Sequence, residues 1–547
     1  MVRRHGGERT SALGGASARI VPRPFVPVHT RPFRPRWHRR RNGPCPSAAR
    51  LDWPSVAGAR RPRGERVAIE VPRRAVLSRP LSVPLIATVV VALPLAVAAQ
   101  PGIGLRDTTF WLQLVVACYA GVRLCAMVLS GRRRLIQGAF WLFGYLAMGI
   151  APLAQSVLGR DPTPVLGPRE DTQLATALVL CGMVAFDVGA LLARLRPLGR
   201  ERGRPASVHR GRLALLVLLA YVASGLLIVQ LGGPGVFFTS RQEISASLAE
   251  ATGAPADGAD GGGEAGSALL RGFGTVPAML ALLFLTRWLV TSRAARRRPA
   301  VVLPWAGLLV LNAIVNNPIS NPRYWFLTVL FALLFTIFPR SPVMYRAALA
   351  VGLAVALLVF PFTDRFRYDE DARRPLETDS VLEPLVVKDY DQLNMFANTV
   401  TFAGDGHGHS YGEQLAGAAL FFVPRGVWSD KPEDTGFLVG GWMGTDSANL
   451  SSPLWAELWL DLGPLGMTAG FAAIGYLAAR TDRRYVRRTV DDPSPGNVLA
   501  VVVPVLAGYS FILLRGSLLQ ASGRIGIALL CLALVTTFRP SRRSELR

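Results

Sequence analysis

Three arginines of this chain, Arg323, Arg425 and Arg515, have the residue type and the placement that phosphate binding requires. Arg323 follows Asn321 and Pro322, which suit a helix start, so it falls in a first helical turn whose free N–H groups favour an anion. A guanidinium also presents a planar fork of donors that matches two oxygens of a phosphate group. The three side chains together predict a site for a diphosphate.

Arg425 lies in the segment FFVPRGVWSDKP, which also contains Trp428 and Lys431. The apolar run before it, QLAGAALFFVP, is too short to span a membrane and predicts a re-entrant or interfacial segment. Non-helical backbone at that depth is tolerated where it lines a cavity or is buried in protein, so we expect Arg425 and Lys431 to line a cavity. Each arginine has an ordinary interpretation as well: Arg323 anchors a helix at the headgroups, Arg425 faces water, and Arg515 satisfies helix-terminal carbonyls.

Four side chains are candidates for a general base: Glu457, then Asp391, then His407 or His409 in GHGHS. A carboxylate needs a partly desolvated site to act as a base near neutral pH. The ordinary interpretation of Glu457 is a helix-start carboxylate that the helix dipole favours. The His-x-His pair lacks clear additional ligands in the sequence, so we predict no metal and no cofactor. The expected sugar-stacking surfaces are three indoles: Trp428, Trp455 and Trp459.

Long apolar runs must position these side chains. Half of the residues are apolar and the mean hydropathy is +0.32, with several runs beyond the ~18 residues that mark a membrane span. The composition predicts an all-α polytopic integral membrane protein with about twelve transmembrane helices, expected at 81–99, 109–129, 136–158, 174–193, 213–231, 272–290, 301–316, 323–339, 347–362, 460–479, 498–514 and 521–538.

The arginines predict the orientation, because cytoplasmic loops retain Lys and Arg. Arginine-rich segments precede the first span and recur on every second loop, at 131–134, 194–212, 292–298, 339–346, 480–488 and 539–547. Both termini are therefore expected in the cytoplasm, and the large loop at about 361–453, between the ninth and tenth spans, is expected outside and catalytic.

Three regions follow from this pattern: a disordered, arginine-rich cytoplasmic tail at 1–79, a polytopic membrane domain at 80–538 and a cytoplasmic tail at 539–547. The net charge of +25 is explained by this topology, and we expect no nucleic-acid partner, since that needs a soluble basic surface.

Two charges lie inside predicted spans at a similar depth. Arg123 and Asp187 both fall on the cytoplasmic side of the midplane, where an isolated charge costs ~2.5 to 3.5 kcal/mol on insertion scales. We expect them to pair as a structural clamp, with a proton or ion relay as the alternative.

Four stretches resemble a known family, the O-antigen polymerase-like or oligosaccharide repeat-unit polymerase membrane proteins. They are YDQLNMFANTV (390–400), GEQLAGAALFFVPRGVWSDKPEDTG (412–436), NLSSPLWAELWLDLGPLG (449–466) and FILLRGSLLQ (511–520). The resemblance covers roughly 210–538 and is strongest after Asn316.

The resemblance implies a glycosyl transfer at the outer face of the cytoplasmic membrane, in surface or exopolysaccharide biosynthesis. It implies that oligosaccharide units carried on polyprenyl diphosphate are joined, with chain-length regulator and flippase proteins as partners beside membrane lipid. Arg323, Arg425 and Arg515 would hold the diphosphate and stabilise the leaving group.

Three alternatives stay open to different degrees. A polyprenyl-phosphate-sugar transferase usually has an acidic pair in the first external loop, where this chain has Asp107 alone. A flippase or transporter of lipid-linked oligosaccharide would show repeat symmetry or broken midplane helices, and the sequence has neither. An O-antigen ligase-type transferase, which moves finished glycan to another acceptor, is hardest to separate from a polymerase.

Overall fold

The computed structural model describes the part of the chain that follows the arginine-rich N-terminal segment. Its compact unit is Val71–Arg547, and the residues described are 83–199, 206–239, 243–244, 247, 261–358, 382–445 and 450–537. The two predicted tails, 1–79 and 539–547, lie outside these residues.

The described residues are mostly helical, which agrees with the predicted fold class. In chain order the elements, with short 3-10 or π-helical segments labelled η, are η1 (Ala87–Ala92), α2 (Leu93–Ala98), α3 (Thr108–Ser130), α4 (Leu135–Tyr145), η2 (Leu146–Ile150), α5 (Ala151–Leu158), α6 (Arg169–Leu195), β1 (Ser207–Val208), α7 (Arg210–Gln230), η3 (Pro234–Phe238), α9 (Gly261–Thr291), α10 (Arg293–Arg296), α11 (Pro299–Val315), α12 (Arg323–Ile337), α13 (Pro342–Leu358), η6 (Glu383–Leu385), η7 (Lys388–Tyr390), α14 (Gln392–Phe402), η8 (Ala403–His407), α15 (Glu413–Ala419), α16 (Thr435–Trp442), α17 (Leu454–Asp491), α18 (Leu499–Arg515), α19 (Leu518–Val535) and β2 (Thr536–Thr537).

Seven helical stretches of the described chain are long and apolar enough to cross a membrane: α3, the continuous run Leu135–Leu158, α6, α7, Leu269–Thr291 of α9, α17 and α19. Five shorter apolar helices also occur, namely Val83–Ala98, α11, α12, α13 and α18. Each predicted span overlaps one of these twelve helices. Only the first seven reach the length of a span, so the helices agree with a polytopic membrane protein, while the count of about twelve spans stays a prediction.

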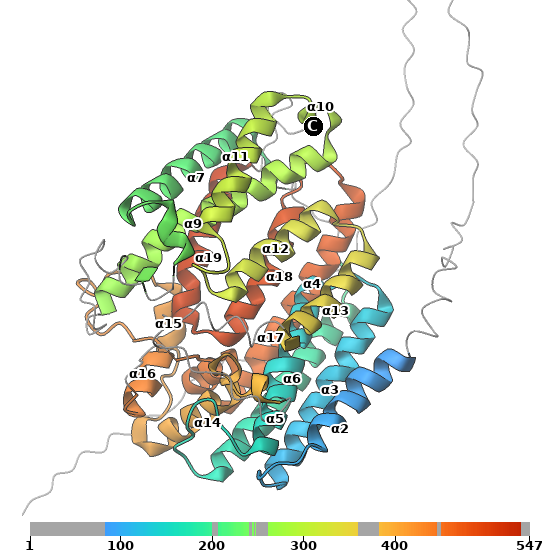
Figure 1. Cartoon of the computed structure of the whole chain (residues 1–547), viewed down its shortest axis with the longest axis vertical. Helices are drawn as coiled ribbons and strands as arrows, with labels where there is room; N and C mark the ends of the chain where they lie inside the picture. The colour runs from blue at the N-terminus through green and yellow to red at the C-terminus, as the bar shows by residue number, and fades with distance from the viewer. Residues whose placement is uncertain are drawn as a thin grey trace, which may run out of the picture. The chain divides into compact units, whose positions relative to one another are not determined.

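The helices bury two large apolar cores. One core collects side chains from α2 to α6, α13, α14 and α17, and the other from α7, α9, α11 and α19. In Figure 1 the first set lies at the lower right and the second at the upper left. Helices α12 and α18 contribute side chains to both cores, so the start of α12 and the end of α18 lie where the two halves meet.

The predicted external loop is partly helical and packs on one end of the bundle. Residues 361–381 and 446–449 lie outside the described chain, and the rest contains α14, α15 and α16, which lie along the lower left of Figure 1. The buried Gln155 side chain at the end of α5 donates to the carbonyls of Leu385 (3.0 Å) and Tyr390 (2.8 Å). We call this end of the bundle the site end.

The other end is held by contacts between the arginine-rich turns. Asp482 of α17 accepts hydrogen bonds from the backbone N–H groups of Ile136 (3.1 Å) and Gln137 (3.2 Å), and so caps the start of α4. The strands β1 and β2 pair antiparallel, with Ser207 opposite Thr537. We call this end the arginine end.

Helix α17 bends at Gly463, which precedes Pro464. Gly463 has φ 65° and ψ −172°, a conformation that glycine adopts readily and that other residues avoid. The bend separates a short first segment, which contains Trp455, Glu457 and Trp459, from the long apolar remainder. The predicted span at 460–479 therefore begins at the bend.

Candidate functional site

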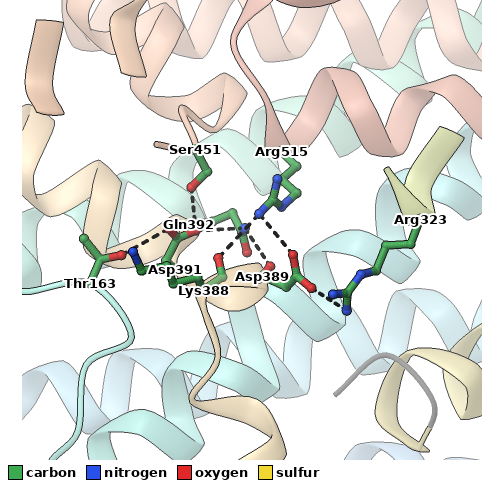
Figure 2. A network of polar contacts seen from close by, with 8 residues as sticks. All are labelled: Thr163, Arg323, Lys388, Asp389, Asp391, Gln392, Ser451 and Arg515. Carbon is green, nitrogen blue, oxygen red and sulfur yellow. Dashed lines mark hydrogen bonds and ion pairs between the residues drawn. The ribbon is translucent and has the colours of Figure 1, made fainter. Parts of the chain in front are cut away.

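Arg323 and Arg515 converge on one carboxylate, that of Asp389, although they come from two different helices (Figure 2). Asp389 Oδ2 lies 2.5 Å from Arg323 Nη1, and Asp389 Oδ1 lies 3.2 Å from Arg515 Nη2. Arg323 and Asp389 are both buried, with 6% of each exposed. The guanidinium of Arg515 also lies over the ring of Tyr324, 5.5 Å from its centroid. We call these four residues the Asp389 cluster.

Asparagine side chains fix the turn that presents Arg323. Asn317 donates to the carbonyl of Phe237 (2.8 Å) and accepts from the backbone N–H of Ser320 (2.7 Å). Asn316 accepts from the indole N–H of Trp325 (2.7 Å), which ties the first turn of α12 to the end of α11. Arg323 is the first residue of α12, as predicted from the sequence.

Asp391 lies beside the Asp389 cluster, at the start of α14. Its carboxylate accepts hydrogen bonds from Thr163 (3.2 Å) and Ser451 (2.5 Å), and Gln392 donates at 3.3 Å (Figure 2). Burial raises the pKa of Asp391 above the usual 3.8, against the opposing effect of Arg515. A raised pKa brings a carboxylate closer to what a general base near neutral pH requires.

Arg425 and Lys431 both donate hydrogen bonds to backbone carbonyls within the turn at 421–431. Arg425 donates to the carbonyl of Lys431 (2.8 Å), and Lys431 Nζ donates to the carbonyls of Phe421 (2.7 Å) and Val423 (3.0 Å). Burial lowers the pKa of Lys431, and Arg425 lowers it further. The structure therefore joins two of the predicted diphosphate ligands in one turn and the other two, Arg323 and Arg515, at Asp389.

This turn is anchored to α19. The ring of Phe421 occupies the space beside Gly526, where a Cβ atom would lie 2.3 Å from the ring. The apolar run before Arg425 forms the short helix α15, with Gln414 and Ala418 buried. This segment packs against α19 and α17 at the site end, and its predicted re-entrant or interfacial placement stays a prediction.

Glu457 lies in a second buried acidic group with Asp434. Glu457 is 3% exposed, and its Oε1 atom makes no hydrogen bond within the described chain. Asp434 lies within electrostatic reach of Glu457 and accepts a hydrogen bond from Ser517 Oγ. Burial raises the pKa of Asp434. The Arg515–Ser517 turn thus has Asp389 near its start and Asp434 near its end.

The predicted histidines occupy different surroundings. His407 is exposed and stacks on Phe402, with ring centroids 4.0 Å apart. His409 is half-buried and packs edge to face on Trp459 at 5.3 Å, and its Nδ1 atom makes no hydrogen bond within the described residues. Neither histidine forms a hydrogen bond or ring contact with the Asp389 cluster among the described residues, and His407 lies at the surface.

Of the three predicted sugar-stacking indoles, Trp455 is placed in the core. It is fully buried, packs on Phe471 (4.5 Å) and Phe140 (5.8 Å), and donates to the carbonyl of Val179 (3.3 Å). Phe140 and Phe471 cover the ring, so no face of it is left for a sugar. Trp428 and Trp459 are half-buried, so both keep some accessible surface.

Sequence reasoning missed Asp389 and Arg524. Asp389 lies two residues before a predicted base, and nothing local marks it. Arg524, in α19, is a charged residue inside a predicted span, and that placement alone could have marked it as a candidate functional residue. Its guanidinium lies over the ring of Trp325, 4.6 Å from the centroid, and it makes no hydrogen bond or ion pair with the described residues. Trp325 therefore lies between Arg524 and the turn that presents Arg323.

Comparison of the chain with protein-family models, curated proteins and solved structures found no match. The geometry alone therefore defines what the site can do. Two guanidinium groups converging on one acidic oxygen pair can bind a phosphate or diphosphate, and a buried carboxylate beside them can accept a proton.

Proposed function

We propose that this chain is a membrane glycosyltransferase that polymerises oligosaccharide repeat units carried on polyprenyl diphosphate. It would act at the outer face of the cytoplasmic membrane, with both termini in the cytoplasm. The observation that carries the proposal is the convergence of Arg323 and Arg515 on Asp389. The sequence resemblance of 390–520 to repeat-unit polymerases supplies the reaction class.

The Asp389 carboxylate occupies the place that a phosphate oxygen pair would take. A carboxylate and a tetrahedral phosphate group each present a pair of oxygens that accepts hydrogen bonds from a guanidinium, and a diphosphate has the greater charge. On substrate binding, Arg323 and Arg515 would transfer their hydrogen bonds from Asp389 to the diphosphate. The attraction between the guanidinium of Arg515 and the ring face of Tyr324 restricts the direction in which its N–H donors point.

The reaction breaks the bond between the anomeric carbon of the growing chain and the diphosphate oxygen. A hydroxyl oxygen of the incoming lipid-linked unit forms the new bond to that carbon, and its proton passes to a base. The polyprenyl diphosphate leaves with the bonding electron pair, and the two arginines stabilise the charge that develops on it. No nucleotide sugar or oxidant takes part in this balance.

Asp391 is the base that we favour over Glu457. It lies in the same segment as Asp389 and feels the charge of Arg515, so an acceptor hydroxyl near the leaving group would be within its reach. Glu457 shares its buried group with Asp434 instead. Asp391→Asn should therefore reduce the rate of chain growth more than Glu457→Gln.

The test is the size distribution of surface glycan in a deletion strain that carries wild type, Arg515→Ala or Arg106→Ala at matched membrane abundance. Arg106 is an exposed arginine that bonds the carbonyl of Gln100 and serves as the control. We expect the deletion strain to show single repeat units, wild type and Arg106→Ala to restore long chains, and Arg515→Ala to fail.

Other outcomes assign other functions. If single units never reach the surface in the deletion strain, the chain moves lipid-linked units across the membrane. If long chains form on the lipid carrier but are not transferred to their final acceptor, the chain is a ligase. If Arg515→Ala restores long chains as wild type does, the Asp389 cluster is not the site.

A further inference from the structure

A second group of arginines lines a cavity at the arginine end. The cavity has a volume of about 440 Å³, and Arg287 of α9 and Arg340, just after α12, both line it. Val290, Ile337 and Phe338 give it an apolar wall. Because Arg323 begins α12 and Arg340 follows its end, the helix places this cavity roughly 22 Å from the Asp389 cluster.

The arginines here contact backbone carbonyls. Arg287 is 3% exposed; its Nη2 donates to the carbonyl of Pro493 (3.1 Å), and its Nε makes no hydrogen bond within the described chain. Arg340 Nε donates to the carbonyl of Thr489 (2.7 Å). Arg133 is also buried and donates to the hydroxyl of Thr489 (3.3 Å). We call Arg133, Arg287 and Arg340 the Arg287 cluster.

Carbonyl oxygens satisfy donors but do not neutralise charge. Asp492 is the acidic residue within electrostatic reach of Arg287, yet it forms no ion pair with it, and its Oδ1 accepts from the N–H of Ser494 (3.0 Å). No ion pair joins an arginine of this cluster to a carboxylate among the described residues. Charges in membrane segments pair with one another or with backbone carbonyls, and a carbonyl partner leaves the positive charge of the guanidinium in place.

We propose that the Arg287 cavity binds the phosphate headgroup of an anionic phospholipid. Arg287 and Arg340 would contact the phosphate, and the acyl chains would lie along the wall of Val290, Ile337 and Phe338. Basic pockets between helices at the cytoplasmic side commonly bind lipid headgroups. The apolar wall favours a lipid over free phosphate, because a free ion would leave that wall in contact with water. This site is independent of the proposed glycosyl transfer.

The experiment uses the purified full-length chain in detergent, with phosphatidylglycerol and phosphatidylethanolamine supplied in equal amounts. Native mass spectrometry counts the lipids retained, and titration gives the apparent affinity. The variants are Arg340→Gln and the double variant Arg287→Gln/Arg340→Gln. Arg484→Gln, an exposed arginine of α17, removes the same charge away from the cavity and is the control.

We expect phosphatidylglycerol to be retained in preference to phosphatidylethanolamine. Arg340→Gln should weaken its binding about fivefold and the double variant about thirtyfold, while Arg484→Gln binds as wild type does. Should the double variant not fold, Arg340→Gln alone decides. Equal retention of both lipids, or equal weakening in Arg484→Gln, overturns the proposal. Complete displacement by millimolar inorganic phosphate overturns the assignment to a lipid and assigns the cavity to free phosphate.

Discussion

The Asp389 cluster and the Arg287 cluster lie at opposite ends of α12 and hold their arginines with different partners. At the site end, a carboxylate from a distant part of the chain binds two guanidinium groups. At the arginine end, the guanidinium groups bind carbonyl oxygens and a hydroxyl. The first arrangement fixes the orientation of the two guanidinium groups. The second leaves a positive charge that an anion from outside the protein can neutralise.

The difference teaches that burial of an arginine does not by itself mark a catalytic site. A carboxylate between two arginines orients both forks toward one point, which suits a reaction that builds charge at that point. Carbonyl partners at the ends of different helices and turns do not direct the guanidinium groups toward one point. That arrangement suits a lipid headgroup, whose negative charge needs only a nearby positive charge.

The largest effect is expected when the carboxylate of the Asp389 cluster is removed. Asp389→Asn leaves two largely buried guanidinium groups without that charge, so the free energy of unfolding should fall by about 3–5 kcal/mol. Added polyprenyl diphosphate should then raise the melting temperature more in Asp389→Asn than in wild type, because the ligand replaces the missing anion. Thermal unfolding in detergent, with and without ligand, measures both effects.

Asp461→Asn is the matched control for that experiment. Asp461 is a buried carboxylate at the site end, but it accepts from the backbone N–H groups of Gly412 (2.9 Å) and Gln414 (3.0 Å) at the start of α15. It should lower stability without rescue by ligand. If ligand shifts both variants equally, Asp389 is a structural partner of the arginines and nothing more.

The geometry of the fork provides the next test. Arg515→Lys keeps the positive charge but loses the planar pair of donors and the stacking on Tyr324, so chain growth should slow roughly hundredfold. The measurement is the rate at which the purified protein in nanodiscs extends lipid-linked units, with Arg106→Lys as the control. A rate close to that of wild type would mean that charge alone suffices at the Asp389 cluster.

A carboxylate can be added to the Arg287 cavity to make it resemble the Asp389 cluster. Ser341 lines the cavity and accepts from the N–H of Met344 (3.2 Å) at the start of α13, a capping role that aspartate fills equally well. Ser341→Asp should therefore keep the fold and weaken phosphatidylglycerol binding about fivefold, the loss of about 1 kcal/mol. Ser341→Asn, which caps without charge, should bind as wild type does; equal loss in both variants contradicts the electrostatic explanation.

The sequence predicted the parts of this architecture that depend on local composition. Apolar run length located the helices, and arginine placement singled out Arg323 and Arg515, which both contact Asp389. The pair of Arg123 and Asp187 also forms as predicted, with the hydroxyl of Tyr119 donating to Asp187 (2.9 Å). These features follow from the cost of charge in an apolar layer, which acts on each segment separately.

Features that depend on distant partners were not predictable. Asp389 is 126 residues from Arg515, and an acidic residue in a polar loop gives no sign of which cation it meets. Trp455 was assigned to sugar stacking, whereas its ring is covered by Phe140 of α4 and by Phe471, which lies beyond the bend of α17. A sequence shows that a residue is aromatic but does not show what covers it.

The smallest effect is expected at an ion pair that lacks burial. Arg169 and Asp107 pair at the site end with 49% and 33% of their side chains exposed, so their coupling energy should be about 0–1 kcal/mol. The hydrogen bond from Arg169 lowers the pKa of Asp107 below 3.8, despite the opposing effect of its slight burial. The stability that this shift contributes is present above pH 3.8 and is lost as the pH falls through the lower pKa of the folded state.

A double-mutant cycle with Arg169→Gln and Asp107→Asn, followed by thermal unfolding from pH 6 down to pH 3, measures that coupling. Arg169→Gln should reduce the loss of stability on the acid side, and helix α3 should remain capped because Asp107 still accepts from the N–H of Phe110 (3.1 Å). A coupling energy above about 2 kcal/mol would make this exposed ion pair comparable in strength to the buried ion pairs of the Asp389 cluster. In that event the coupling energy of an arginine at the site end would depend on its ion pair and not on its burial.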